Sequence, residues 1–295
     1  MSGIRKFKAR WILWLVVSFF ILVTVTFLVL PPKGHISVLM YHFVLPEFRV
    51  GTSSLNVSVD EFRRQMWFLK TFGFRVISLD ELYDIKTGKA KPRGKEVVVT
   101  FDDGNISYLE FALPILALYQ IKSANFLIWE HLERRWPDDI SLEKAQLLSY
   151  HSLVTLGSHT LSHPNLLEVS AEQAQTEIME SKGKLEKALS HPVHYFSYPS
   201  GFFDQRTMKL VQEAGYRLAF TTARKRLSGN QETLYSIPRI KIGPKDNLFI
   251  FWLHVSGLTD YVKRIDHFCQ RMFHRLTGNG VGGKLTVYKP GYETM

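Results

Sequence analysis

Cysteine is nearly absent from this chain of 295 residues, which contains only Cys269. One cysteine cannot form an intrachain disulfide, and it excludes a zinc module built from several cysteines. Charged residues make up 22% and hydrophobic residues 45% of the chain, with 12 Pro and 19 Gly. This composition excludes a mainly disordered or collagen-like protein. The length suits one large domain or two small ones with a substantial core.

Negative charge is in modest deficit. The chain has 37 Lys and Arg against 27 Asp and Glu, a formal net charge of +10. Four of the basic residues, Arg5, Lys6, Lys8 and Arg10, precede an apolar run, and without them 33 basic residues face 27 acidic ones, a net charge of +6. An excess of this size does not indicate nucleic-acid binding. We therefore expect no nucleic-acid partner.

A long run without charge follows these basic residues. Trp11 to Leu30 is a 20-residue stretch, long enough to cross the hydrocarbon core of a bilayer as a helix. The basic flank is expected to stay in the cytoplasm. The prediction is a cytoplasmic N-terminus at 1–10, a single-pass transmembrane anchor at 11–30 and an extracellular domain after it. A cleaved signal peptide is the alternative, although residues 27–32 offer no small-x-small cleavage site.

From residue 36 onward, short apolar or β-branched runs alternate with amphipathic helices. Alternation of this kind predicts an α/β barrel or a doubly wound sheet. Serines with capping-box spacing mark three helix starts, at Ser58, Ser78 and Ser170. The predicted strands are Ile36–Tyr41, Arg75–Ile77, Val97–Phe101, Asn125–Ile128, Val154–Gly157, Tyr195–Tyr198, Leu218–Thr221 and Ile237–Ile240.

The alternation weakens after Gly243. We place the main domain at 35–245 and a C-terminal extension, a helix plus a loose tail, at 246–295. Residues 263–275 of this extension are basic and fit either a solvated helix face or a scaffold on a membrane surface.

Two adjacent carboxylates end one of the buried strands. Val97 to Phe101 is followed directly by Asp102, Asp103 and Gly104. The carboxyl ends of parallel strands form the active face of α/β folds, and two neighbouring carboxylates repel unless a metal or another cation lies beside them. The alternative interpretation, without a functional role, is a polar Asp-Gly turn.

A pair of histidines follows another predicted strand. His159 and His163 are four residues apart in a turn, so that both imidazoles can face one ion. With one carboxylate they make a two-His-one-Asp site that leaves coordination positions free for water or substrate. Exposed loop histidines are the alternative, but the strand ending in Asp-Asp favours a metal site.

Three further strands carry weaker signals. Tyr198 to Gly201 is a tight turn whose backbone amide is expected beside the metal in the functional interpretation. His42 ends the first strand and is either a structural histidine or an acid. Arg239, on the last strand, is either a surface cation or the partner of a buried carboxylate.

Together these segments resemble the polysaccharide deacetylase family, the NodB-homology domains of carbohydrate esterase family 4. Thr100-Phe101-Asp102-Asp103-Gly104 is similar to the first family motif, and His159-Thr160-Leu161-Ser162-His163 to its His-x-x-x-His motif. The turn at 198–201 is similar to the third motif. The resemblance covers roughly residues 35–245 and implies a distorted (β/α) barrel that removes N-acetyl, or occasionally O-acetyl, groups from polysaccharides.

The resemblance also implies roles for individual residues. Asp103, His159 and His163 are expected to bind one divalent metal ion, with Zn first and Ni, Co, Mn or Fe as alternatives. Asp102 is expected to be the general base that takes a proton from the attacking water. The oxyanion is expected to lie against the metal and the backbone amide of Ser200, next to Tyr198.

Two departures from the family pattern point to one branch of it. Many members have Arg at the position of Ser197, and a C-terminal Leu-x-His motif has no convincing copy, since His254 has the wrong spacing. Both departures resemble the circularly permuted poly-β-1,6-N-acetylglucosamine (GlcNAc) N-deacetylases of biofilm systems. This branch implies His42, in Tyr41-His42, as the general acid, and we expect Arg239 to replace the missing arginine beside Asp102.

The predicted function is therefore a membrane-anchored, extracellular, metal-dependent N-deacetylase of a GlcNAc polymer, with poly-β-1,6-GlcNAc as the expected substrate. Peptidoglycan, chitin oligomers and acetylated xylan are alternative substrates. A catalytically silent carbohydrate-binding protein on the same fold is the alternative from another class, against which the retained Asp102 argues. Phe202, Phe203 and Trp129 are either sugar-stacking aromatics or ordinary packing residues.

Overall fold

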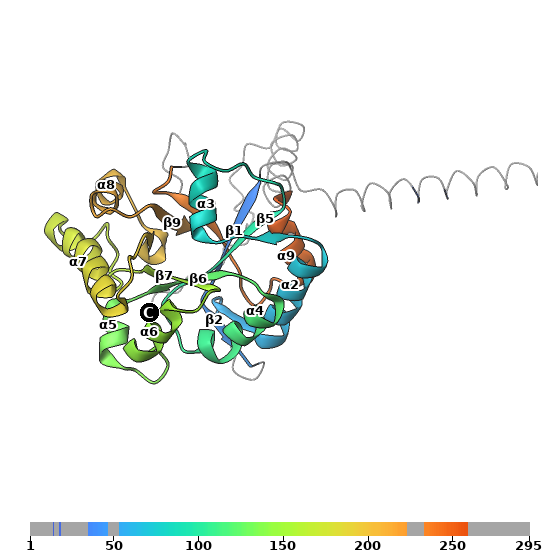
Figure 1. Cartoon of the computed structure of the whole chain (residues 1–295), viewed down its shortest axis with the longest axis horizontal. Coiled ribbons are helices and arrows are strands. Elements are labelled where there is room, and N and C mark those ends of the chain that lie inside the picture. Colours follow the sequence, from blue (N-terminus) through green and yellow to red (C-terminus); the bar gives the residue numbers. More distant parts are fainter. Residues whose placement is uncertain (1–13, 15–17, 19–34, 47–52, 223–232, 259–295) are drawn as a thin grey trace, which may run out of the picture. The chain divides into compact units, whose positions relative to one another are not determined.

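Parallel strands close into a barrel in the computed structural model, which describes residues 35–46, 53–222 and 233–258 and the single positions 14 and 18. The strand order is β1-β10-β9-β8-β7-β6-β5, and β5 pairs back with β1 to close the ring. Figure 1 shows the helices arranged around these strands. An eighth strand, β4, adds to the other edge of β5. The strands of this sheet are β1 (Ile36–Tyr41), β4 (Arg75–Val76), β5 (Glu96–Phe101), β6 (Ser123–Leu127), β7 (Val154–Ser158), β8 (Tyr195–Ser197), β9 (Leu218–Thr222) and β10 (Ile237–Lys241).

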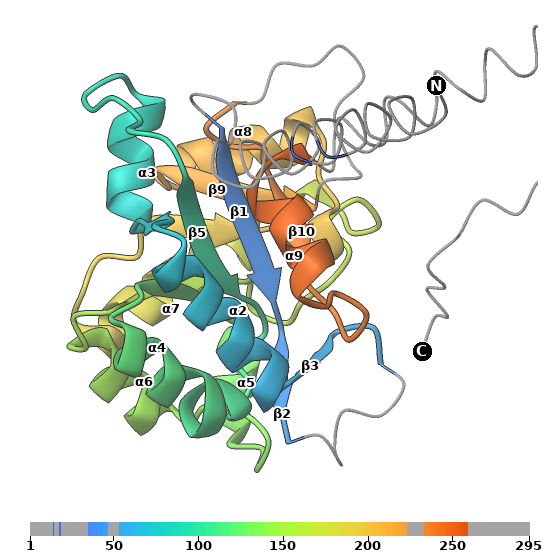
Figure 2. The same cartoon turned by 90° about the vertical axis from the view of Figure 1, so that its right-hand side faces the viewer.

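The pairing of β5 explains both the closure and the distortion of the barrel. All six residues of β5 are buried, and they pair in register with β1 from Ile36 opposite Glu96 to Tyr41 opposite Phe101. The other edge of β5 is divided, because β4 pairs with its first two residues and β6 with its last two. Figure 2 shows β1 and β5 side by side. The predicted distorted (β/α) barrel is confirmed, and the closed ring excludes a doubly wound sheet.

Helices connect the strands, and several begin at caps that the sequence predicts. The side chains of Ser58, Ser78 and Ser170 each accept a hydrogen bond from the backbone amide three residues later. Asp204 forms a reciprocal capping box with Thr207. The helices are α2 (Val59–Thr71), α3 (Leu79–Lys86), the π-helix η2 (Tyr108–Ala112), α4 (Leu113–Tyr119), α5 (Trp129–Arg134), α6 (Leu142–Ser149), α7 (Ala171–Leu189), the 3-10 turn η3 (Pro199–Gly201), α8 (Gln205–Glu213) and α9 (Leu248–Val255).

The core inside the barrel is apolar and is closed by α3. Inward-facing residues of six strands, among them Val38, Val98 and Phe126, form one buried cluster with Leu79 and Leu82 of α3. Glu96 begins β5 and Arg75 begins β4, and their side chains lie 3.2 Å apart at the amino end of the strands. The carboxyl ends of the strands are thereby left as the face on which polar side chains gather.

Each predicted strand has a counterpart in the barrel, within two residues at either end. A separate pair of short parallel strands, β2 (Phe43–Leu45) and β3 (Asn56–Ser58), was not predicted. Each has three residues, which is too short for a period-two pattern to be distinguished from a loop.

The segments outside the barrel are described only in part. No helix among the described residues is long and apolar enough to cross a bilayer. The predicted anchor at 11–30 lies outside the described residues except for positions 14 and 18, and the basic segment at 263–275 lies outside them entirely. Helix α9 falls in the predicted extension at 246–295 but packs on the barrel, where Phe251 contacts Phe68 of α2 edge to face.

Gly157 provides a test of this packing. A Cβ atom at Gly157 would lie 2.5 Å from the Phe126 ring and 2.9 Å from the Tyr195 carbonyl oxygen. We expect Gly157→Ala to lower the free energy of unfolding by about 1–3 kcal/mol, because the barrel interior cannot yield without backbone movement. Urea unfolding measures this change.

Gly183→Ala is the matched control. Gly183 lies in α7 with no atom within 4 Å of an added Cβ, so alanine should raise the free energy of unfolding by about 0.5–1 kcal/mol. Equal effects of the two substitutions would contradict the assigned packing of β7 against Phe126.

Candidate metal centre

Three predicted ligands meet at the carboxyl ends of β5 and β7. Asp103 follows β5, and His159 and His163 follow β7; one ligand atom from each lies within 4.8 Å of the others. The Nε2 atoms of His159 and His163 are 3.5 and 3.8 Å from Oδ1 of Asp103. All atoms that would bind an ion therefore face one point.

The chemistry of this donor set fits a divalent cation. Oδ1 of Asp103 is buried and has no hydrogen-bond partner among the residues that the structure describes, a costly arrangement unless a cation or water occupies the point it faces. Nδ1 of His159 lies 2.7 Å from the Ser197 carbonyl oxygen. Because a carbonyl only accepts, this bond puts the proton on Nδ1 and leaves the Nε2 lone pair directed at Asp103.

The charge state of His159 agrees with a ligand role. Burial lowers the pKa of His159 to about 4, and the nearby His163 acts in the same direction, against the opposing effects of Asp102 and Asp103. The imidazole is therefore neutral at pH 7. A neutral imidazole is the form that binds a metal ion.

The backbone reaches this geometry through left-handed conformations. Asp103, Thr160 and His163 have φ values of 72°, 70° and 63°, a region that non-glycine residues rarely occupy and that is especially unusual for a β-branched threonine. Residues held in this way cluster at functional sites. The Thr160 side chain accepts a hydrogen bond from the His163 amide at 3.0 Å and so stabilises the turn between the two histidines.

A buried carboxylate that the sequence reasoning missed holds this turn. Glu177 of α7 accepts hydrogen bonds from the backbone amides of Leu161 and Ser162 at 2.9 and 3.0 Å and from the Ser162 hydroxyl at 2.5 Å. It is 5% exposed. In the sequence it reads as one more charged residue of an amphipathic helix, and only the fold places it under the His-x-x-x-His turn.

Asp102 lies beside the ligands in a different environment. It is 3% exposed, and its carboxylate accepts from both terminal nitrogens of Arg239, at 2.7 and 2.6 Å. Burial by itself opposes ionisation, but the Arg239 guanidinium, and then His159 and His42, hold the pKa of Asp102 well below its usual range. Asp102 is therefore an ionised carboxylate 4.0 Å from Nε2 of His159.

Ser197 explains how Arg239 reaches this carboxylate. The guanidinium is 1% exposed, donates to the Ser197 hydroxyl at 2.7 Å and to Thr100 at 3.2 Å, and lies over the Phe126 ring. A serine on β8 leaves room for an arginine that comes from β10. The structure thus brings Arg239 and Asp102 together, as predicted from the sequence departure at position 197.

The other predicted site residues are placed around this centre. The Asp102 amide donates to the Tyr41 carbonyl at 3.1 Å, which puts His42 beside Asp102. Nδ1 of His42 is buried and has no hydrogen-bond partner within the described part of the chain. Ser200 is exposed in η3 with φ of 52°. Tyr198 is buried; its amide donates to the Phe220 carbonyl and its hydroxyl to the Tyr235 carbonyl.

Two other sequence candidates take structural positions. His254 lies on α9 with Nε2 3.4 Å from Asp246. Trp129 and Phe203 are each 8% exposed, so neither presents a ring for stacking against a sugar.

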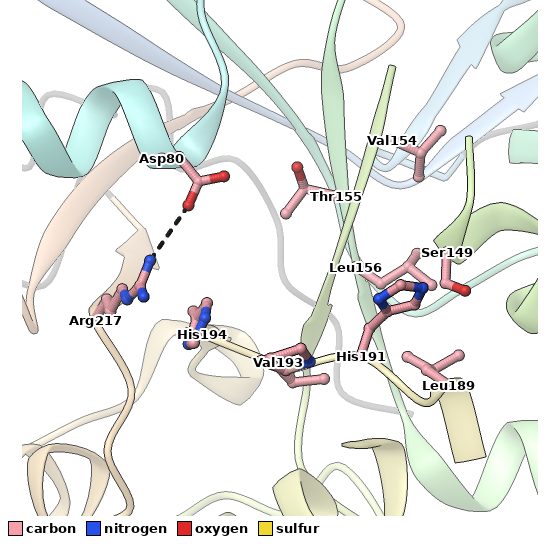
Figure 3. Close-up of a pocket in the computed structure, with 11 residues that line it drawn as sticks. Asp80, Ser149, Val154, Thr155, Leu156, Leu189, His191, Val193, His194 and Arg217 are labelled. Carbon is pink, nitrogen blue, oxygen red and sulfur yellow. Dashed lines mark ion pairs between the residues drawn. The ribbon is translucent and has the colours of Figure 1, made fainter. Parts of the chain in front are cut away.

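A separate pocket lies at the opposite end of the barrel, near the starts of β7 and β8 (Figure 3). It contains an Asp80–Arg217 ion pair at 3.5 Å and the histidines His191 and His194. None of the predicted ligands lines this pocket. The candidate metal centre is instead the point at which the side chains of Asp103, His159 and His163 meet.

Comparison with known proteins agrees with this geometry. Residues 89–219 match the family model described as polysaccharide deacetylase. The range includes Asp102, Asp103, His159 and His163 but neither His42 nor Arg239.

Individual relatives extend the comparison along the chain. The Bacillus subtilis protein YxkH is 27% identical over 75% of this chain and 76% of its own length. Poly-beta-1,6-N-acetyl-D-glucosamine N-deacetylase of Staphylococcus aureus is 28% identical over 63% of this chain and 68% of its own. The structure of the Streptococcus pyogenes deacetylase PplD in complex with acetate superimposes with a TM-score of 0.68 at 28% identity, over 76% of this chain and 99% of PplD.

Replacing Glu177 should weaken metal binding. We expect Glu177→Ala to lower the affinity for Zn²⁺ by about 10–100-fold, because the turn between the two histidines loses its buried acceptor. Glu177→Gln should restore most of the affinity, since its amide oxygen can still accept from the two backbone amides. Titration of the full chain against a competing zinc chelator measures both.

Glu180→Ala, an exposed glutamate on the same helix, is the control and should bind Zn²⁺ like the unmodified chain. Wild-type affinity in a folded Glu177→Ala variant would show that the turn does not depend on Glu177.

Arg239→Gln should destabilise the fold in a pH-dependent way. It leaves Asp102 buried without its counter-charge, at a cost of about 3–5 kcal/mol near neutral pH. Since the folded-state pKa of Asp102 lies below its unfolded value of about 3.9, the ion pair contributes fully above that pH and less as the pH falls. The difference in unfolding free energy between the wild type and Arg239→Gln should therefore shrink below about pH 4.

Urea unfolding near neutral pH and below about pH 4 measures this difference, with the Arg239→Gln/Asp102→Asn double variant as the control. The double variant removes the isolated charge and should recover most of the lost stability. A difference that does not change with pH would mean that the ion pair is not the cause.

Proposed function

Since this chain carries a polysaccharide deacetylase domain, we propose that it is a metal-dependent N-deacetylase that hydrolyses the acetamido groups of a poly-β-1,6-GlcNAc polymer. The observation that carries the proposal is the convergence of Asp103, His159 and His163 beside a separate, ionised Asp102. A protein that only binds carbohydrate has no need of a further ionised carboxylate next to three metal ligands.

Asp103, His159 and His163 would hold the ion, with Zn²⁺ as the first candidate. When bound, the metal acts as a Lewis acid toward the acetyl carbonyl and makes a water molecule more acidic. The left-handed conformations of Asp103 and His163, and the hydrogen bonds accepted by Glu177 and by the Ser197 carbonyl, keep these donors oriented before any ion arrives.

Asp102 would be the general base. Its two oxygens accept from Arg239, and Oδ2 also accepts from the Ser197 hydroxyl at 3.3 Å. A carboxylate has about four acceptor positions, which leaves one for the attacking water. The ion pair keeps Asp102 ionised across the working pH range. In the reaction Asp102 takes one proton from this water as its oxygen bonds to the acetyl carbon.

His42 would be the general acid. Breaking the carbon–nitrogen bond requires a proton on the leaving nitrogen. His42 directly follows β1, and Asp102 directly follows the neighbouring strand β5. The products are acetate and an amine on the sugar. The His42 proton goes to that amine.

The turn at η3 would bind the oxyanion through the Ser200 amide. Ser200 is exposed beside β8. The hydroxyl and the amide of Tyr198 are already hydrogen-bonded within the fold. Tyr198 would therefore hold the turn that carries Ser200 rather than contact the sugar.

The substrate assignment is supported by His42, by Ser197 with Arg239, and by the named S. aureus relative. We further propose that residues 11–30 anchor the enzyme in the cell membrane with the barrel outside. Removal of acetyl groups there would expose amines and hold the polymer to anionic cell surfaces.

Acetate release by the full chain in detergent or vesicles tests the proposal. The substrates are β-1,6-GlcNAc oligomers, chitin oligomers and peptidoglycan, each assayed with a chelator and after Zn²⁺ is restored. We expect metal-dependent release, mainly from the β-1,6 oligomers. General acid–base catalysis contributes about 10²–10⁴-fold, so Asp102→Asn and His42→Ala should each lower kcat by about that factor while Zn²⁺ still binds.

Asp103→Ala is the matched control, because it should lose both the metal and the activity. Release only from chitin or peptidoglycan would keep the chemistry and change the substrate. A metal-loaded chain that releases no acetate from any of the three would favour a carbohydrate-binding protein, and undiminished turnover of His42→Ala would remove His42 as the acid.

A further inference from the structure

Helix α5 and the turn that follows it connect both ligand segments of the metal centre. The amides of Trp129 and Glu130 at the start of α5 donate to the carbonyls of Thr160 and Leu161, which lie between the two ligand histidines. The start of α5 is therefore bonded directly to the turn that carries the two histidines.

The turn after α5 is attached to the other ligand segment. Ile140 donates to the Gly104 carbonyl and Ile106 to the Asp138 carbonyl, each at 2.8 Å, and Asn105 forms an antiparallel bridge with Asp139. Gly104 directly follows the ligand Asp103. Residues 136–140 are thereby fixed at the rim of the metal centre.

Trp136 lies at the start of this fixed turn and is 47% exposed. Its ring is held by its neighbours: the His131 ring is 5.1 Å away, and the Arg134 guanidinium lies 5.4 Å from the ring centroid. His131 is oriented by Asp139 at 3.1 Å. The indole is thus restrained on a fixed backbone, although nearly half of its surface meets solvent.

We propose that Trp136 is a sugar-binding residue that receives a neighbouring GlcNAc unit of the polymer while another unit lies at the metal. This inference rests on the proposed function and adds a second contact point for the same substrate. An indole face combines an apolar surface with a polar N–H, which suits the C–H face of a pyranose ring and its polar rim. A restrained ring loses little conformational entropy when it binds.

This position predicts a dependence on chain length. The Trp136 ring contacts His131 and Arg134, and neither of these residues is a candidate metal ligand. An oligomer can contact Trp136 and the metal together, whereas N-acetylglucosamine as a monosaccharide has one ring to offer. Trp136 should therefore raise kcat/KM and binding affinity for the oligomer but not for the monosaccharide.

The experiment compares Trp136→Ala with Trp67→Ala in the full, zinc-loaded chain. Trp67 is a matched control because it is 44% exposed and lies on α2, where its ring contacts Phe72. We expect Trp136→Ala to lower kcat/KM for a β-1,6-GlcNAc oligomer by about three- to tenfold, the range typical of one aromatic contact. Its activity on the monosaccharide, and both activities of Trp67→Ala, should stay unchanged.

Oligomer binding to the metal-free chain, measured by calorimetry, separates this inference from the proposed function. Trp136→Ala should weaken that binding by a similar factor, and Trp136→Tyr should restore it. Weaker oligomer binding in Trp136→Ala without any turnover in the wild type would support the stacking site and reject the deacetylase.

Three results would overturn the inference. They are an oligomer kcat/KM and affinity equal to the wild type in Trp136→Ala, equal losses on oligomer and monosaccharide, or no oligomer binding by the wild type. Retention of oligomer binding together with loss of binding to a protein would instead make Trp136 part of a protein interface.

Discussion

The buried ion pair between Arg239 and Asp102 is the interaction on which the site depends. It joins β10 to the end of β5 through two short hydrogen bonds, and Ser197 and Thr100 complete the environment of the guanidinium. A carboxylate as buried as Asp102 would otherwise favour its protonated form. Because Arg239 keeps it ionised, a charged carboxylate can lie next to the three candidate metal ligands at the carboxyl ends of the strands, and the ion pair links the positions of β5, β8 and β10 to this site.

The metal ligands depend on the backbone to the same degree. Asp103 and His163 have left-handed conformations, which local bonds must maintain. Thr160 accepts from the His163 amide, Glu177 accepts from the amides of Leu161 and Ser162, and the Ser197 carbonyl orients His159. The fold thus orients the three candidate ligands without help from an ion.

The barrel and the positions of the candidate ligands could be predicted from the sequence, because apolar runs followed by polar motifs mark the ends of strands. Apolar runs followed by Asp-Asp and by His-x-x-x-His locate the ligands, and the closed barrel follows the predicted alternation. Ser197 stands where many family members have an arginine, so another cation was expected beside Asp102, and Arg239 was the candidate. Glu177 and Trp136 were not predictable, since each resembles an ordinary helix or loop residue until the chain brings α7 and the turn after α5 to the ligand segments. The short strands β2 and β3 and the packing of α9 on α2 likewise depend on tertiary contacts.

The central claim, that the Asp103, His159 and His163 cluster is a hydrolytic metal centre, is tested most directly by one titration. The full chain is stripped with a chelator and returned to Zn²⁺ in steps, while bound metal and the rate of acetate release from a β-1,6-GlcNAc oligomer are measured in the same samples. We predict that the rate rises in proportion to occupancy and reaches its maximum at one ion per chain. A rate that is unchanged by metal removal, or that stays at zero with one ion bound, would contradict the account.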